Sequence, residues 1–339
     1  MKAIRYHGGV DLRVEDVAAL TPQDGEVVVD VVACGVCGSD LHFLDGTARP
    51  SRTPITLGHE IAGVVATSDD ERWPPGAPVV IAAGLSCLVH CRWCLGGRPN
   101  LCDQVRMTGI DFDGGWAEQL VISADALISR PAELDAAVAG VAADAGATAF
   151  HAIARRGAVA EGMSIAIIGV GGLGTFAVQI AKRLGAAPVI AVDTSPAALG
   201  AAKALGADVV VNAAEVDSVG RQIKVESEGG VDVAAEFVGA ASTVDDAVKS
   251  LRRGGVAVAV GIGSSPLVTI PPTLWAMSEY ELRGSFGSLP GDTELVLEWL
   301  AGGQLAPPAL KRISLSDAPG AILEAAAGRP SLERLVIEP

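Results

Sequence analysis

The feature that most constrains the fold is the glycine-rich segment 169–174, Gly-Val-Gly-Gly-Leu-Gly, which follows a short apolar run and opens a helix-period stretch. Glycines at these positions let the backbone turn tightly and approach a pyrophosphate, whose charge is stabilised by free N–H groups at the helix N-terminus. The segment therefore predicts a βαβ unit that binds a dinucleotide through Gly169, Gly171, Gly172 and Gly174.

An acidic residue lies where such a site needs one. Asp193 follows the strand-like run Val189–Val192, about 20 residues after the last glycine, where the carboxylate binds the ribose hydroxyls. A carboxylate there would repel a 2′-phosphate, and residues 194–198 supply no Arg or Lys to bind one. We therefore expect NAD rather than NADP. The alternative is an ordinary glycine-rich βα turn with Asp193 as a helix cap.

Strand-like and helix-like segments alternate from about residue 146 to residue 285. This alternation predicts a doubly wound parallel sheet, an α/β fold of the Rossmann type. The expected strands are 164–168, 189–192, 208–211, 231–236, 256–260 and 281–285, and the expected helices are 173–184, 196–205 and 243–251.

The first part of the chain has a different pattern. Its β-branched runs, bounded by Gly and Pro, predict a β-rich region with long loops at 26–33, 61–66, 78–83 and 119–123. Near the other end, a helix over 294–301 and a strand over 335–337 could return to this region. We therefore expect one domain over 1–145, joined by 286–339, and a dinucleotide-binding domain over 146–285.

Four cysteines crowd into a short polar loop. Cys87, Cys91, Cys94 and Cys102 have C-x3-C-x2-C-x7-C spacing, and four thiolates can close a tetrahedron around zinc, which defines a structural site. His90 lies inside the loop and could replace Cys87 as the outermost ligand. Four buried or free thiols are the alternative to a metal site.

A second set of residues suits a catalytic metal. Cys37 and His59 are ligands that zinc prefers, and a site with three protein ligands leaves the fourth position for water or substrate. The expected third ligand is Asp144, a lone carboxylate among small apolar residues, where a charge needs a partner. A role for Asp144 as the N-cap of the following helix competes with this interpretation.

Composition narrows the classes of partner. The 339 residues carry a formal net charge of -15, which argues against nucleic acid or an anionic membrane surface as partner. We see no signal peptide and no uniformly apolar span, and all six cysteines lie between residues 34 and 102, which favours metal over disulfides. We therefore expect a cytoplasmic protein.

Together these motifs resemble the zinc-containing medium-chain dehydrogenases of the alcohol dehydrogenase superfamily, across nearly the whole chain. The resemblance rests on the order of Cys37-Gly-Ser-Asp-Leu-His42, Gly58-His-Glu60, the four-cysteine loop, Asp144-Ala-Gly-Ala-Thr148 and the glycine-rich segment. The last two motifs are similar to those of bacterial NAD-dependent secondary alcohol dehydrogenases. The resemblance implies a β-rich GroES-like catalytic domain beside the Rossmann domain.

The resemblance also implies roles for single residues. Cys37, His59 and Asp144 would bind the catalytic zinc, with Glu60 behind the metal or as an alternate ligand and Asp40 orienting His59. Ser39 and His42 match a relay that carries the substrate proton to solvent. Further matches place Thr148 and Leu173 near the nicotinamide and Arg334 at the pyrophosphate.

The expected reaction is hydride transfer between NAD and a small, mostly apolar alcohol, above all a secondary alcohol with its ketone, or else a primary alcohol with its aldehyde. A polyol or sugar dehydrogenase of the same superfamily is one alternative, and a non-catalytic NAD-binding sensor is another. Trp116, Trp275 and Phe286 are candidates to line the substrate pocket. The family resemblance implies a homo-oligomer, a tetramer or dimer. The loop departs from the usual C-x2-C-x2-C-x7-C pattern by one residue between Cys87 and Cys91.

Overall fold

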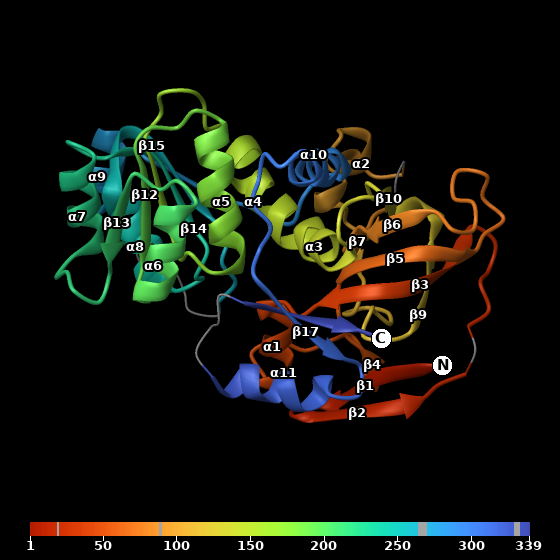
Figure 1. Cartoon of the computed structure of the whole chain (residues 1–339). Helices are drawn as coiled ribbons and strands as arrows, with labels where there is room; N and C mark the ends of the chain where they lie inside the picture. The colour runs from red at the N-terminus through yellow and green to blue at the C-terminus, as the bar shows by residue number, and fades with distance from the viewer. Residues whose placement is uncertain (19, 88–89, 264–269, 329–332) are drawn as a thin grey trace. The chain divides into compact units, whose positions relative to one another are not determined.

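The computed structural model describes residues 1–18, 20–87, 90–263, 270–328 and 333–339. The chain forms two compact units (Figure 1). Unit 1 comprises Met1–Ala147 and Gly287–Pro339, and unit 2 comprises Thr148–Phe286. These bounds lie close to the domain limits expected from the sequence.

Unit 2 is built on a six-stranded, all-parallel sheet with the order β13-β12-β11-β14-β15-β16. The order reverses between β11 and β14, which is the doubly wound arrangement whose ligands bind at the carboxyl ends of the strands around that reversal. The strands are β11 (Ile165–Ile168), β12 (Val189–Asp193), β13 (Val209–Asn212), β14 (Val231–Glu236), β15 (Leu251–Ala259) and β16 (Glu281–Gly284).

Helices cover this sheet. Helices α5 and α6 pack against each other, as do α7 and α8, which fits two helical layers joined by right-handed crossovers (Figure 1). The short α9 starts at a proline, where the missing N–H costs no helical hydrogen bond. The helices are α5 (Gly172–Arg183), α6 (Pro196–Ala204), α7 (Val219–Glu226), α8 (Ala241–Ser250) and α9 (Pro272–Ser278).

Unit 1 is β-rich. Its largest sheet has the path β10-β6-β5-β3-β18-β17, with β9 also paired to β3, and smaller sheets have the orders β2-β1-β4 and β7-β8. Strand β18 pairs with β3, so the end of the chain joins unit 1. The strands are β1 (Lys2–Gly8), β2 (Asp11–Asp16), β3 (Glu26–Gly35), β4 (Ile55–Thr56), β5 (Glu60–Thr67), β6 (Pro78–Ile81), β7 (Gly84–Leu85), β8 (Arg106–Met107), β9 (Gln119–Ser123), β10 (Leu127–Ser129), β17 (Leu310–Ser314) and β18 (Arg334–Glu338).

The hydrophobic core of unit 1 is built around the central strand β3. Its buried side chains, among them Val27, Val29 and Val31, pack with Ile61 and Trp116. The helices of this unit are α1 (Gly38–Leu44), α2 (Arg92–Leu95), α3 (Ala136–Val141), α10 (Pro290–Ala301) and α11 (Ala318–Ala327), with single 3-10 turns at Pro99–Leu101 and Ala124–Ala126.

One helical stretch, Ala136–Arg156, continues from α3 through a π-helical turn at Ala142–Gly146, α4 (Ala147–Phe150) and a second π-helical turn at His151–Arg156. It is long and apolar enough to cross a membrane, but 83% of its most apolar window is buried inside the protein. Core helices of soluble proteins share these properties, so the length and composition of this stretch are weak evidence for a membrane span.

Candidate active site and metal centres

Helix α1 fixes the first metal-ligand candidate. Cys37 is the N-cap of α1, and its backbone N–H donates a hydrogen bond of 2.9 Å to Oδ2 of Asp40. Asp40 satisfies one of the N–H groups left free where the helix begins, as in a capping box. The same turn carries Ser39, and His42 follows one turn later on α1, so the motif 37–42 is one rigid structural unit.

His59 directly precedes β5 and follows a backbone turn that only glycine accommodates. Gly58 has φ +92°, and a Cβ there would lie 2.3 Å from the Trp116 ring and 2.7 Å from Sγ of Cys34. Trp116 is fully buried in this packing. The expectation that Trp116 lines a substrate pocket is therefore wrong, because its ring fills the space behind the Gly58 turn.

Asp144 projects from the π-helical turn Ala142–Gly146, inside the long helical stretch. π-turns widen the helix and re-aim side chains, and they recur at functional sites. The N-cap of α3 is Asp135, whose side chain accepts from the N–H of Val138. The N-cap alternative for Asp144 is therefore wrong, since helical backbone precedes and follows it.

The structure brings Cys37, His59 and Asp144 together, with one potential ligand atom from each within 4.8 Å of the others. Oδ2 of Asp144 lies 3.8 Å from Sγ of Cys37 and 3.7 Å from Nε2 of His59. A tetrahedral zinc with ordinary bond lengths sets such ligand pairs about 3.4–3.6 Å apart. The three side chains therefore fit one zinc ion and leave a fourth coordination position.

The charges around this set also suit a cation. Burial would lower the pKa of His59, but Asp40 and Asp144 raise it well above its ordinary value. Burial would raise the pKa of Asp144, yet His59 and Arg334 hold it below its usual range. The site therefore keeps a buried carboxylate ionised, and a dication would replace the proton on the imidazole.

The neighbouring polar groups converge on His59. Oδ1 of Asp40, a fully buried residue, lies 3.5 Å from Nδ1 of His59, on the side of the ring away from Asp144. Oγ of Ser39 lies 3.4 Å from Nε2. His42 is about one-third exposed and lies 3.5 Å from Asp45, so its ring can exchange a proton with solvent.

Glu60 is fully buried and forms an ion pair with Arg334 at the start of β18. Burial raises the pKa of Glu60, although Arg334 opposes that shift. The missing Cβ of Gly35 makes room for this carboxylate, because a Cβ would lie 2.0 Å from Oε2 of Glu60. The structure thus pairs Arg334 with a residue of its own unit.

The four cysteines of the loop also come together. Sγ of Cys94 lies 3.6 Å from the sulfurs of Cys87 and Cys91, and the Cys91 and Cys102 sulfurs are 3.8 Å apart. A tetrahedral zinc with Zn–S bonds of about 2.3 Å would set the sulfurs about 3.8 Å apart. The extra residue between Cys87 and Cys91 does not keep Cys87 out of the cluster.

His90 points elsewhere. It is exposed, and its Nδ1 lies 3.0 Å from the carbonyl oxygen of Cys87. Within the cluster, the N–H of Cys94 lowers the pKa of Cys91 to about 6, whereas partial burial raises the pKa of Cys94 to about 12. The Cys91 thiolate is ready to bind a cation, and the Cys94 thiol would release its proton on binding zinc.

Cys34 takes part in neither metal set. It is fully buried, and burial raises the pKa of its thiol well above the ordinary value. Its Sγ donates a weak hydrogen bond to the carbonyl oxygen of Gly35 at 3.6 Å. A protonated, inaccessible thiol behaves as a small apolar side chain.

In unit 2, the glycines of the turn between β11 and α5 are required for different structural reasons. Gly169 has φ +89°, and a Cβ there would lie 2.6 Å from Val238. A Cβ on Gly174 would lie 2.1 Å from the carbonyl oxygen of Gly169, so only glycine lets α5 pack so close to the turn. A Cβ on Gly171 would meet nothing within 4 Å, which leaves open space where a pyrophosphate would fit.

Asp193, at the carboxyl end of β12, forms a hydrogen bond with the same turn. Its Oδ2 accepts a hydrogen bond of 2.8 Å from the N–H of Val170, and its Oδ1 accepts one of 2.9 Å from Ser195. Each oxygen retains a lone pair for a ribose hydroxyl. Gly172 and Leu173 form the first turn of α5. Thr148, the first residue of unit 2, is buried.

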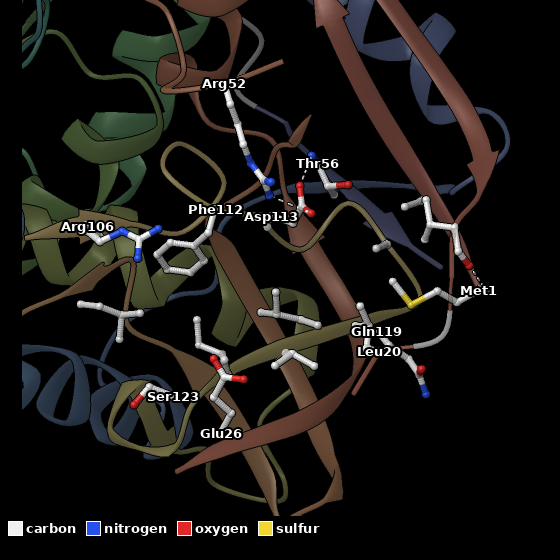
Figure 2. A pocket seen from close by; sticks show the side chains of 18 of the residues that line it. Met1, Leu20, Glu26, Arg52, Thr56, Arg106, Phe112, Asp113, Gln119 and Ser123 are labelled. Atoms are coloured by element: carbon white, nitrogen blue, oxygen red, sulfur yellow. Dashed lines mark hydrogen bonds and ion pairs between the residues drawn. The ribbon is translucent and has the colours of Figure 1, made fainter. Parts of the chain in front are cut away.

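One cavity lies beside the four-cysteine loop, away from Cys37, His59 and Asp144. It has a volume of about 1040 Å³ in unit 1, between the first strands, β9 and the cysteine loop (Figure 2). Arg5 and Arg52 at its wall both pair with Asp113, so part of its charge is balanced internally. Only Cys87 among the candidate ligands lines it.

Sequence reasoning missed one buried acid of unit 2. Glu236 ends β14 as Asp193 ends β12, and it is 1% exposed. An acid directly after a buried strand was the available signal, since such a position lies at the ligand-binding edge of a parallel sheet.

Both parts of the chain match families of known proteins. Residues 23–132 match the alcohol dehydrogenase GroES-like domain, and residues 172–302 match the zinc-binding dehydrogenase domain. An NAD-dependent alcohol dehydrogenase from Saccharolobus solfataricus is 30% identical over 95% of both chains.

Two solved structures show the same likeness. The acetophenone reductase from Geotrichum candidum, in complex with NAD, has 30% identity and a TM-score of 0.88, covering 100% of this chain and 97% of that one. A protein from Sinorhizobium meliloti 1021, bound to NADP, has 28% identity and a TM-score of 0.90, covering 100% and 99%.

The chain belongs to the zinc-containing medium-chain alcohol dehydrogenases. This membership confirms the family that the sequence motifs indicated and the expected fold class, a Rossmann-type parallel sheet together with a GroES-like β-rich domain.

Proposed function

We propose that this chain is an NAD-dependent zinc alcohol dehydrogenase, which moves a hydride between NAD and a small, mostly apolar alcohol. A secondary alcohol, the expected substrate, gives a ketone, and a primary alcohol gives an aldehyde. The observation that carries the proposal is the convergence of Cys37, His59 and Asp144 at distances that suit one zinc with an open position. The similar alcohol dehydrogenase and the NAD-bound acetophenone reductase support the reaction class.

In this proposal Cys37, His59 and Asp144 hold the catalytic zinc. Thiolate and carboxylate together balance the charge of a dication. Glu60 lies behind this set, held there by Arg334, and Asp40 fixes the orientation and tautomer of His59. Bound zinc supplies a Lewis acid that favours loss of the alcohol proton near neutral pH.

Two residues of α1 then move the proton. Ser39 Oγ, 3.4 Å from Nε2 of His59, accepts the alcohol proton beside the metal position and in exchange releases its own hydroxyl proton toward His42. His42, partly exposed on the next turn of the same helix, passes a proton to solvent. Ser39→Ala should therefore lower kcat at pH 7 without lowering zinc content, and full activity of this variant would exclude the relay.

Unit 2 is the proposed NAD-binding domain, and unit 1 the catalytic domain. The turn formed by Gly169, Gly171, Gly172, Leu173 and Gly174 would cradle the pyrophosphate, and Asp193 would bind the ribose hydroxyls. Thr148 and Leu173 are proposed to pack near the nicotinamide. The proposed contact of Arg334 with the pyrophosphate would be additional to its ion pair with Glu60.

The four-cysteine loop is proposed to hold a structural zinc through Cys87, Cys91, Cys94 and Cys102. Cys87 is the better ligand because its sulfur lies in the cluster, whereas His90 lies against a backbone carbonyl. We also propose a soluble, cytoplasmic homo-oligomer, dimer or tetramer, and light scattering on the purified chain would measure its size. The net charge of -15 supports solubility.

One experiment tests the proposal as a whole. The purified protein is assayed with secondary alcohols, ketones and sorbitol-like polyols, each with NAD and with NADP, and zinc is measured per chain. We expect turnover of secondary alcohols with NAD and two zinc ions per chain. Preference for polyols would favour the sugar dehydrogenase alternative, and preference for NADP would overturn the role of Asp193. Cofactor binding without any turnover would indicate a sensor.

A further inference from the structure

Glu236 lies at the ligand-binding edge of the parallel sheet and has no role in the proposed hydride and proton transfer. It is the last residue of β14, paired in register with Ile168 at the end of β11 and Ala259 at the end of β15. The strand order reverses between β11 and β14, so this carboxylate lies at the switch point where doubly wound sheets bind ligands. Its side chain is 1% exposed.

One oxygen of this carboxylate gathers the loop that follows β14. Oε1 of Glu236 accepts hydrogen bonds from the N–H groups of Val238 at 2.7 Å and Gly239 at 2.8 Å, and from the Thr243 hydroxyl at 2.7 Å. The backbone oxygen of Glu236 accepts from Val260 at 2.9 Å. A single residue therefore fixes the loop 237–240 and contacts the segment that follows β15.

The loop fixed by Glu236 packs against the cofactor turn. The space that a Cβ of Gly169 would fill is taken by Val238, at 2.6 Å. Gly239 in turn packs directly on the segment after β15, because a Cβ on Gly261 would lie 2.0 Å from the nitrogen of Gly239. The three segments that end β11, β14 and β15 are thus interlocked, with no room for a larger residue at the contacts.

The other oxygen, Oε2, is buried and has no hydrogen-bond partner within the described part of the chain. Leaving a buried carboxylate oxygen without a donor costs about 1–3 kcal/mol or more, and buried polar groups of purely structural residues are normally satisfied. The three hydrogen bonds that Oε1 accepts offset this cost, so the loop 237–240 depends on this side chain for its position.

We propose that Glu236 is a positioning residue for the dinucleotide: it holds the loop 237–240 against the Gly169 turn, so that the cofactor edge of unit 2 is formed before NAD binds. The inference rests on the proposed NAD-binding role of this unit. Because the three donors converge on one oxygen, hydrogen-bond acceptance rather than charge is the property that matters. Gln offers the same acceptor, whereas Ala offers none.

The test measures NAD affinity directly, by calorimetric titration of the zinc-loaded full-length protein, together with steady-state kinetics. We expect Glu236→Ala to raise the Kd for NAD roughly tenfold or more, a loss of about 1.4 kcal/mol, while Glu236→Gln stays within about threefold of the unmodified protein. The KM for alcohol at saturating NAD and the zinc content should not change. Glu226→Ala, on α7 of the same unit, is the control and should bind NAD normally.

Other results would overturn the inference. An unchanged Kd in Glu236→Ala would remove the positioning role, and a Gln variant as weak as the Ala variant would show that charge is what matters. If Glu236→Ala does not fold, Thr243→Val removes one donor alone and should raise the Kd by a smaller factor; an unchanged Kd there would count against the inference. Failure of the unmodified protein to bind NAD would instead contradict the proposed function.

Discussion

Asp40 connects the two metal-ligand candidates of the opening motif: its Oδ2 accepts a hydrogen bond from the backbone of Cys37, and its Oδ1 faces Nδ1 of His59 at 3.5 Å. The carboxylate is fully buried, and the backbone N–H of Cys37 supplies it with a hydrogen bond in place of water. One side chain therefore sets both the position of the Cys37 thiol and the orientation of the His59 ring.

Replacing Asp40 by Asn should consequently weaken metal binding without removing a ligand. The amide keeps one acceptor but loses the charge that polarises His59, and changes of this kind typically cost 10–100-fold in metal affinity. Competition with a chelator, followed by zinc analysis, measures that affinity. Asp30→Asn, at an exposed position on β3, is the matched control. Equal zinc retention in both variants would show that Asp40 only caps α1.

Two glycines of the dinucleotide turn should respond differently to the same substitution. Gly174→Ala forces a Cβ to within 2.1 Å of a backbone oxygen, and overpacking of this kind costs about 1–3 kcal/mol of folding free energy. Gly171→Ala meets only open space and has φ -82°, so the fold should tolerate it. The added methyl would instead occupy the position expected for the pyrophosphate.

The two measurements that separate these effects are the melting temperature and the Kd for NAD. We expect Gly174→Ala to lower the melting temperature, and Gly171→Ala to leave it unchanged while raising the Kd roughly tenfold. Normal NAD affinity in a stable Gly171→Ala protein would mean that the cofactor does not approach this turn.

The sequence was informative about unit 2 because its strands are short, apolar and separated by helices. The expected strand over 231–236 matches β14, and the expected strand and helix that flank the glycine turn differ from β11 and α5 by one residue at most of their ends. Helices α7 and α9 were not expected. Helices α7 and α9 span only eight and seven residues, so each offers too few apolar positions for a helical period to stand out in the sequence.

The sequence predicts which residues are the candidate zinc ligands, but it does not predict how they come together in space. Cys37 and His59 belong to short motifs, whereas the position of Asp144 depends on a π-helical turn that no residue pattern announces. Trp116 was misjudged because a large aromatic residue near a motif fits a pocket wall as well as a packed core. Only the close approach of Gly58 shows that the ring is core.

Removal of one sulfur should separate the two proposed zinc sites. Cys94→Ser removes the sulfur that lies 3.6 Å from both Cys87 and Cys91, so we expect zinc to fall from two ions per chain to one. Loss of a structural zinc removes binding energy that supports the fold, so the melting temperature should also fall. Cys34→Ala, which deletes a buried thiol outside both clusters, should keep two ions. Two ions in Cys94→Ser would exclude this loop as a zinc site.

Asp208, directly before β13, provides a pH-dependent test of unit 2. Its Oδ2 accepts from the N–H of Val189 at 2.7 Å, and Nζ of Lys182 lies 3.0 Å from Oδ1. Partial burial acts to raise the pKa of Asp208, but these two donors lower it below the ordinary value. The ionised carboxylate is therefore favoured in the folded state.

Because the folded pKa lies below the unfolded one, Asp208 stabilises the protein above about pH 4, and this contribution is lost as the pH falls through the folded pKa. Asp208→Asn should cost about 1 kcal/mol at pH 7, a figure kept small because the side chain is 40% exposed and its ion pair is screened by solvent. Urea unfolding at pH 7 and at lower pH would measure the difference, which should shrink on acidification. Asp24→Asn, at an exposed turn, is the control, and an equal cost at every pH would show that ionisation of Asp208 contributes nothing.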